Sequence, residues 1–191
     1  IGNINKVINS GWLTTGKFAT KFANKFSKIL GAKYALPLNS CTSALHLALK
    51  ISGIKKGDYV LVPSMTFAAT AEIIEYEGAI PIFLDVDYNS SLITPEILMK
   101  EIKKYQKRIK AVFIVHFAGI SANMIEIKKI CRKYNIKILE DCAHAFPSIY
   151  NKRHVSAYGE VSCFSFYANK TITTGEGGML VTNNSKLYKK A

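Results

Sequence analysis

The stretch Tyr59–Asp87, YVLVPSMTFAATAEIIEYEGAIPIFLDVD, indicates a strand, a helix and a second strand in direct succession. The apolar run Tyr59–Val62 predicts a buried strand, and Ala68–Glu77 predicts a helix with Gly78 as its C′ residue. The run Pro81–Leu84 predicts the second strand. Short apolar strands separated by helices are typical of βαβ units, in which the strands run parallel.

The same alternation of short apolar runs and helical patterns continues along the chain. Further strands are predicted at Lys33–Leu38, Ala111–Val115, Ile136–Leu139, Val161–Phe166 and Met179–Thr182. Further helices are predicted at Thr42–Ile51, from Thr94 and Pro95 onward, at Asn123–Tyr134 and at Ser185–Ala191. We therefore expect residues 1–191 to form a single α/β domain in which helices flank a mainly parallel sheet. Ligands of such folds lie at the carboxyl ends of the strands.

The composition argues against two classes of protein. The chain has 191 residues, and its 26 basic and 13 acidic residues give a net charge of +13. The basic residues are almost all lysines on predicted helix faces, without the interleaved aromatic residues of a nucleic-acid stacking surface. We therefore expect a solvated lysine surface and no nucleic-acid partner. No run of about 18 apolar residues is present, so we expect no membrane span.

The four cysteines, Cys41, Cys131, Cys142 and Cys163, form no CxxC pair. Their spacing fits neither a zinc site nor a disulfide framework, so we expect no bound metal. Reduced thiols are typical of the cytoplasm, where we expect the protein to be located.

The two ends of the sequence also carry information. Apolar residues recur at helical spacing between Phe18 and Leu30, beside a row of lysines. We expect this amphipathic helix to dock on the domain rather than on a membrane. The sequence begins at Ile1 rather than at Met and stops at Ala191 inside a predicted helix, so we expect both ends to be cuts in a longer protein.

A lysine stands between a predicted buried strand and a glycine-rich turn, in SCFSFYANKTITTGEGG, residues 162–178. Most lysines of the chain lie on predicted helix faces, but Lys170 has no helix to lie on. A lysine amine in an apolar setting is a nucleophile for a carbonyl group. The alternative from this segment alone is an ordinary loop lysine.

Two acids, Glu140 and Asp141, directly follow an apolar strand, and His144 comes three residues later. Buried acids are costly unless they have partners. An aspartate at the carboxyl end of a parallel strand can hold a cation or a protonated ring nitrogen. The alternatives are that Asp141 caps nearby backbone amides and that His144 is a packing residue.

Two further strand ends carry candidate binding residues. Thr42 and Ser43 begin a predicted helix, whose N-terminus can bind phosphate through backbone N–H groups and the helix dipole. An ordinary helix cap is the alternative. Phe67 follows another strand, where its ring can stack on a flat cofactor or belong to the core. No GxGxxG or GxxxxGK[ST] motif indicates a dinucleotide or ATP site.

Together these residues supply an amine for a Schiff base, an acid for a pyridinium, a phosphate-binding turn and an aromatic lid. This combination predicts a pyridoxal 5′-phosphate (PLP) site.

The chain resembles the DegT/DnrJ/EryC1/StrS family of PLP-dependent sugar aminotransferases, which have the fold-type I architecture. The resemblance covers essentially the whole chain, and its motifs occur in the order typical of the family. They are GWLTTG (11–16), SCTSALHLAL (40–49), GDYVLVPSMTFAAT (57–70), the segments 115–119 and 140–145, and 163–180. The segment 169–179 is most similar to GDP-perosamine synthases, which aminate a nucleotide-linked 4-keto-6-deoxy sugar.

The resemblance assigns a role to each candidate residue. It implies that Lys170 carries the cofactor, that Asp141 pairs with the pyridine nitrogen and that His144 lies near the 3-oxygen of the ring. It further implies phosphate contacts from Thr42, Ser43 and Ser165, and ring stacking by Phe67. The sequence departs from the family pattern at Cys41, where glycine is frequent, and at Ala118 and Ser121, where an aromatic residue and a proline are common. The roles of Trp12, Thr14, Thr15 and His116 stay open.

The resemblance also implies an activity, which is transamination of a nucleotide-linked keto sugar with glutamate as donor, for polysaccharide or amino-sugar biosynthesis. Family members are about twice as long, so we expect this chain to be a large PLP-binding domain without the carboxyl-terminal small domain. The family site lies at a homodimer interface. Three alternatives stay open: a PLP-dependent sugar dehydratase, whose lysine is replaced by histidine, a non-catalytic remnant or regulator, and a basic binding module, which the charge pattern disfavours.

Overall fold

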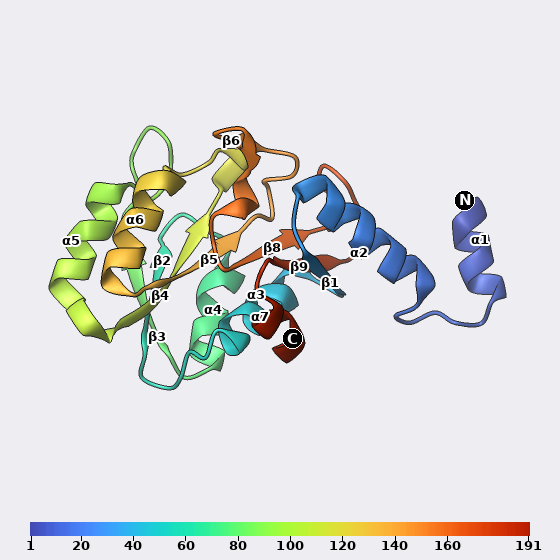
Figure 1. Cartoon of the computed structure of the whole chain (residues 1–191), viewed down its shortest axis with the longest axis horizontal. Helices are drawn as coiled ribbons and strands as arrows, with labels where there is room; N and C mark the ends of the chain where they lie inside the picture. Colours follow the sequence, from blue (N-terminus) through green and yellow to red (C-terminus); the bar gives the residue numbers. More distant parts are fainter.

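A seven-stranded sheet forms the centre of the computed structural model, which describes residues 1–106 and 108–191 (Figure 1). Across the sheet the strands are β1 (Tyr34–Leu38), β9 (Gly178–Thr182), β8 (Val161–Ser165), β5 (Lys137–Asp141), β4 (Ile109–Val115), β2 (Tyr59–Pro63) and β3 (Ile80–Leu84). Strand β9 pairs antiparallel with both of its neighbours, whereas all other pairs of neighbouring strands in this sheet are parallel. The predicted α/β fold with a mainly parallel sheet is confirmed.

Helices cover both faces of the sheet because its strands are apolar on both faces. In β2, Val60 and Val62 belong to the core beneath α3 (Cys41–Ile51) and α4 (Ala68–Tyr76). Leu61 points the other way, as alternation along a strand requires, into the core with α5 (Pro95–Tyr105) and α6 (Met124–Tyr134).

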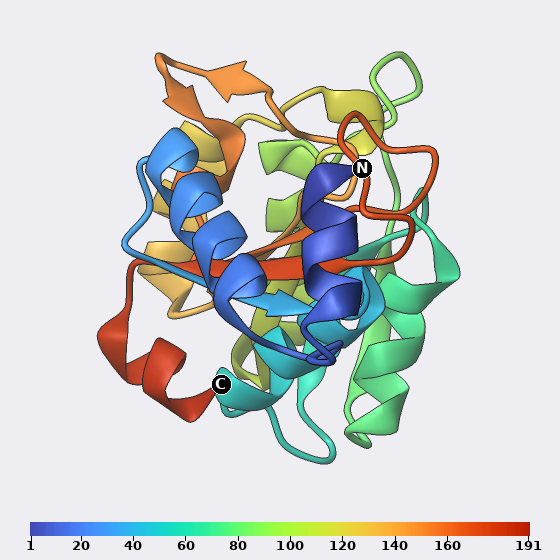
Figure 2. The ribbon, with the colours of Figure 1, turned by 90° about the vertical axis from the view of Figure 1, so that its right-hand side faces the viewer.

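Helix α2 (Lys17–Leu30) packs over the β8–β9–β1 part of the sheet, on the same face as α5 and α6 (Figures 1 and 2). The ring of Phe26 is fully buried there and meets the rings of Phe164 and Phe166 edge-on at 5.0 and 5.2 Å. The expected docking of this amphipathic helix on the domain is confirmed.

Helix α1 (Gly2–Asn9) was not predicted from the sequence. It lies apart from the body of the molecule, and none of its residues is buried (Figure 1). Its apolar residues Ile4 and Ile8 are exposed. Sequence periodicity over eight residues is too short to predict an isolated helix, because such a helix is marginal without packing.

The predicted helix starts are close to the observed ones. Thr94 caps α5 by accepting a hydrogen bond from the backbone N–H of Ile97 at 3.3 Å, and Pro95 is its first residue. The remaining short elements, several of which no pattern predicted, are β6 (Ile149–Tyr150), β7 (Arg153–His154), the 3-10 turns Gln106–Arg108, Phe117–Gly119 and Val155–Ala157, and the helix α7 (Ser185–Lys190). Over the described residues, no helix has the length and apolar character needed to cross a membrane.

Candidate functional site

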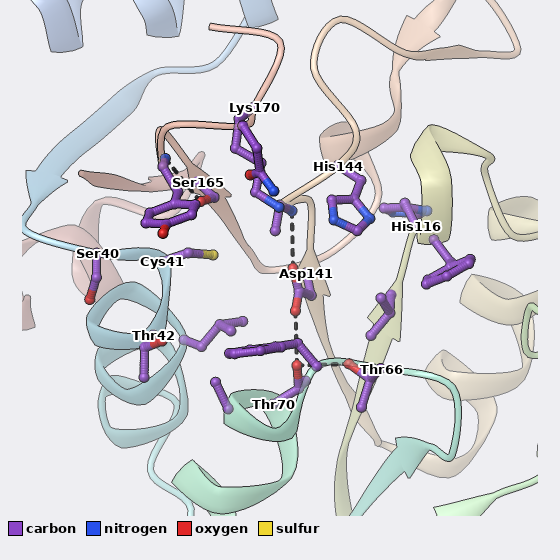
Figure 3. A pocket seen from close by; sticks show the side chains of 18 of the residues that line it. Ser40, Cys41, Thr42, Thr66, Thr70, His116, Asp141, His144, Ser165 and Lys170 are labelled. Carbon is purple, nitrogen blue, oxygen red and sulfur yellow. Dashed lines mark hydrogen bonds between the residues drawn. The ribbon is translucent and has the colours of Figure 1, made fainter. Parts of the chain in front are cut away.

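A cavity of about 530 Å³ lies where the carboxyl ends of β2, β4, β5 and β8 meet (Figure 3). Its volume is typical of small-molecule sites, which measure roughly 300–1,000 Å³. The polar and charged residues among those that line it are Ser40, Thr42, Thr66, Thr70, His116, Asp141, His144, Ser165, Asn169, Lys170 and Glu176. The topology therefore places a cavity at the strand ends, where the sequence predicted a ligand site.

The N-terminus of α3 forms one wall of this cavity. Ser40 caps the helix, because its Oγ accepts a hydrogen bond from the backbone N–H of Ser43 at 3.1 Å. Gly178 lies directly against this turn, and a Cβ there would overlap the carbonyl group of Ser40. The first turn of α3 thus presents backbone N–H groups and the positive end of the helix dipole to the cavity, which favours an anion.

The two hydroxyl residues predicted at this helix start behave differently. Thr42 is exposed and lines the cavity. Ser43 does not line it, and its Oγ lies 3.0 Å from the Oγ of Ser40. The substitution of the frequent glycine by Cys41 needs no unusual backbone, because Cys41 is the first helical residue and does not have a positive φ.

Asp141 lies at the end of β5 and is only 5% exposed. Its Oδ2 accepts a hydrogen bond from the Oγ1 of Thr70 at 2.9 Å, and its Oδ1 accepts one from the backbone N–H of Ala143 at 3.0 Å. Burial raises the pKa of Asp141 above its ordinary value, while these two hydrogen bonds oppose the rise. The predicted capping contact with a nearby amide is therefore present, and the carboxylate still lines the cavity.

Lys170 lies in the loop between β8 and β9 and is half-buried. Its backbone N–H donates to the carbonyl oxygen of Tyr167 at 3.0 Å, which fixes the loop. Among residues 1–106 and 108–191, none forms an ion pair with its amine. Figure 3 shows Lys170, Asp141 and Thr70 in one column along the cavity, with Asp141 between the other two. The structure therefore brings the predicted amine and acid together.

The other predicted contacts surround this column. Phe67 is 79% exposed and lines the cavity, so it does not belong to the core. His144 is also exposed, lies with its ring 5.9 Å from that of Phe117, and is not a packing residue. Partial burial and the nearby charge of Lys170 lower the pKa of His144. Ser165, at the end of β8, is half-buried and lines the cavity as well.

Two threonines in the cavity were not predicted as functional residues. Thr66 precedes α4 and Thr70 lies in its first turn, and the Oγ1 of Thr66 donates to the Oγ1 of Thr70 at 2.9 Å. The recurrence of a small hydroxyl residue at helical spacing after a strand end is the only sequence signal that could have indicated them.

A second cluster of polar residues adjoins the cavity, which His116 also lines. The Nε2 of His116 lies 3.0 Å from the Oε2 of Glu140, and neither side chain is exposed. With Cys142, these residues place three potential metal ligands within 4.8 Å. The Oε1 of Glu140 already accepts from Ser162, and burial raises the pKa of the Cys142 thiol, which keeps it protonated. This cluster is therefore a poor cation site.

A comparison with protein-family models gives a match over residues 1–191, to the DegT/DnrJ/EryC1/StrS aminotransferase family. The chain belongs to this family. The resemblance that the sequence motifs indicated is confirmed. The observed sheet and flanking helices agree with the fold-type I architecture expected of a DegT/DnrJ/EryC1/StrS member.

Individual relatives of the chain include enzymes of two kinds. GDP-perosamine synthase of Escherichia coli O157:H7 is 41% identical over 189 residues, which are 98% of this chain and 51% of that protein. The aminotransferase of Psychrobacter cryohalolentis has a TM-score of 0.93 at 34% identity, covering 98% of this chain and 47% of that one. The GDP-4-keto-6-deoxy-D-mannose-3-dehydratase of E. coli was solved with bound hydrated PLP. It has a TM-score of 0.91 at 28% identity, and the match covers 97% of this chain and 48% of that one. The chain spans about half the length of the curated relatives it matches.

Proposed function

We propose that the protein uses PLP to transfer the amino group of glutamate to a nucleotide-linked keto sugar. The observation that carries this proposal is the placement of Lys170 and Asp141 in one cavity beside the N-terminus of α3. Membership of the aminotransferase family and the PLP bound in a related structure support it.

The residues of the cavity fit this cofactor. The first turn of α3 suits the phosphate group, and we propose that Thr42 and Ser165 donate hydrogen bonds to it, with Ser43 supporting the turn. The buried carboxylate of Asp141 has hydrogen-bond donors on both oxygens. It forms no ion pair within residues 1–106 and 108–191, so a protonated ring nitrogen would supply the missing charge. The exposed ring of Phe67 would stack on the cofactor, and His144 would contact it, because both residues line the cavity.

The chemistry divides between the cofactor and the protein. When bound, PLP supplies an electron sink that stabilises negative charge on the carbon bearing the amino group. The amine of Lys170 would hold the cofactor and, once free, would move a proton to and from that carbon. Asp141 keeps its partner nitrogen protonated, because only an anion at this position favours the charged ring.

We further propose a substrate class and an assembly for the protein. The relatives named GDP-perosamine synthase and the family resemblance favour a nucleotide-linked 4-keto-6-deoxy sugar, with a role in polysaccharide biosynthesis in the cytoplasm. We expect a homodimer in which both subunits complete the sugar site. A related dehydratase is the alternative activity. The family resemblance implies histidine in place of the lysine in that class, whereas Lys170 is present here.

Reduction of the cofactor linkage tests the proposal directly. Purified protein carrying this chain is mixed with PLP and should absorb visible light. Borohydride should then fix the cofactor to Lys170, as peptide mapping of the reduced protein can establish. Lys170→Ala should abolish the label, whereas Lys33→Ala, at an exposed lysine outside the cavity, should leave it unchanged. A label on any other lysine would contradict the assignment.

A further inference from the structure

The hydroxyl group of Thr70 points away from its own helix. A threonine in a helix commonly donates to the backbone carbonyl oxygen four residues earlier. Thr70 instead donates to Asp141, which lies 71 residues later in the sequence. Both residues are buried, with Thr70 at 0% and Asp141 at 5% exposure. The buried hydroxyl group of Thr70 therefore has the carboxylate of Asp141 as its acceptor, and not a carbonyl oxygen of its own helix.

The direction of each hydrogen bond in this chain follows from the charge of Asp141. An ionised carboxylate only accepts hydrogen bonds, so Thr70 must donate its single proton to Oδ2. The Oγ1 of Thr70 is then left as an acceptor, and it receives the proton of Thr66 at 2.9 Å. The two hydroxyl groups thus form a relay that ends on the anion, and each bond strengthens the next.

The relay also restricts the orientation of the carboxylate. Thr70 holds Oδ2 and the backbone N–H of Ala143 holds Oδ1, so the plane of Asp141 is fixed from two sides (Figure 3). Phe67, the N-cap residue that precedes α4, has an apolar side chain and makes no capping hydrogen bond with it. The hydroxyl groups near this helix start therefore serve Asp141 and do not cap the helix.

We propose that Thr70 is a positioning residue which, together with Thr66, holds Asp141 as an aligned anion for a protonated ring nitrogen. This inference rests on the proposed function, because it requires a ligand that has such a nitrogen. Thr70 acts through Asp141 and does not itself react.

The test compares two ligands that differ at the ring nitrogen. PLP carries the nitrogen, and its 1-deaza analogue has carbon in its place and makes no ion pair with Asp141. Dissociation constants of both are measured for the unchanged protein and for Thr70→Val, which removes the hydroxyl group and keeps the shape. We expect Thr70→Val to weaken PLP binding about 10- to 100-fold, as for loss of a hydrogen bond to a charged group. Binding of the deaza analogue should not change.

Three further variants make the result specific. Thr70→Ser keeps the hydroxyl group and should restore the preference for PLP. Thr66→Val removes only the hydrogen bond from Thr66 to Thr70 and should reduce the preference for PLP over the deaza analogue in part. This variant provides the test if Thr70→Val does not fold. Thr182→Val removes a buried hydroxyl group that donates to the carbonyl oxygen of Glu160, outside the cavity, and should leave the preference intact.

The possible outcomes separate the relay from the proposed function. Equal weakening of both ligands in Thr70→Val, or no weakening of either, would overturn the role of Thr70 while leaving the proposed function in place. If the unchanged protein binds PLP and the deaza analogue equally, the pairing of Asp141 with the ring nitrogen fails, and the relay fails with it.

Discussion

Glu140 and His116 form a fully buried pair at the edge of the cavity, with 3.0 Å between the Oε2 of Glu140 and the Nε2 of His116. Neighbouring strands carry these residues, because β5 ends in Glu140 and Asp141 while His116 follows β4. Asp141 accepts hydrogen bonds from Thr70 and Ala143, whereas Glu140 accepts them from Gly159 and Ser162. The two adjacent acids therefore have separate roles. Asp141 lines the cavity, whereas Glu140 connects β5 by hydrogen bonds to the segments that carry His116, Gly159 and Ser162.

Removal of the Glu140 carboxylate should destabilise the protein strongly. Glu140→Ala leaves His116 and the backbone N–H of Gly159 without their acceptor in the interior, whereas Ser162 still donates to the carbonyl oxygen of Ser156. The expected loss is about 3–5 kcal/mol of unfolding free energy. The matched control is Glu126→Ala, which breaks an exposed pair with Lys129 and should cost no more than about 1 kcal/mol. Chemical denaturation of both variants measures the difference, and equal losses would contradict the structural role of Glu140.

Loss of the charge at Asp141 should change the pH dependence of stability in the cofactor-free protein. Burial raises the pKa of Asp141 in the fold, so the folded state binds a proton that the unfolded state has already released. Stability is therefore lost as pH rises from the ordinary aspartate pKa of about 3.9 through the higher folded value. Relative to the unchanged protein, Asp141→Asn should gain stability across this window, as denaturation at several pH values can establish. No relative gain across the window would exclude this contribution.

The same substitution should abolish most of the turnover while preserving the fold. Asp141→Asn cannot hold the ring nitrogen of the cofactor as a cation, so we expect turnover of glutamate and keto sugar to fall by orders of magnitude. Cofactor binding through the phosphate group should persist, and equilibrium dialysis measures it separately. Near-normal turnover of this variant would refute the role of Asp141.

A decrease in pH should weaken the fold through His154. Burial lowers the pKa of His154 to about 4, and its Nε2 has no hydrogen-bond partner among the residues that the structure describes. The unfolded state therefore binds a proton below about pH 6.5 that the folded state does not bind, and stability is lost as pH falls from about 6.5 to about 4. His154→Asn retains an acceptor for the backbone N–H of Ser156 and should flatten this part of the profile. An unchanged profile would assign the loss to other groups.

Thr42 and Ser43 should contribute unequally to phosphate binding. Thr42→Val removes a hydroxyl group that faces the cavity, and it should weaken PLP about tenfold or more without weakening pyridoxal, which lacks the phosphate. Ser43→Ala removes a hydroxyl group that contacts Ser40, so its effect on PLP should be smaller. Titration of both variants with both compounds decides the comparison. An equal loss for the two substitutions would show that Ser43 contacts the phosphate directly.

The protein should associate with itself in solution. Phe67, Phe83 and Tyr88 are exposed at 79%, 56% and 96%, and β3 is an edge strand that carries Phe83. Large apolar side chains and open strand edges of this kind are usually covered by a partner. Sedimentation should therefore detect a dimer or a larger species at micromolar concentration. A monodisperse monomer would contradict the proposed assembly.

The sequence by itself determined the α/β fold and the position of the cavity. Apolar runs such as Tyr59–Val62 and helix signals such as Thr94–Pro95 are local, because periodicity and capping depend on neighbouring residues. Parallel strands bring their carboxyl ends to one edge of the sheet, so Lys170 and Asp141 could be expected to lie near each other. The motifs around them were sufficient to identify the family.

Only the tertiary structure decided which polar groups meet one another. Thr70 reaches Asp141 across 71 residues, Glu140 turns to His116, and the hydroxyl group of Ser43 turns to Ser40 rather than to the cavity. These contacts depend on strand order and on side-chain direction at each strand end, which no local pattern specifies. A buried polar group must find a partner wherever the packing supplies one, and the partner is chosen by three-dimensional proximity rather than by spacing along the chain.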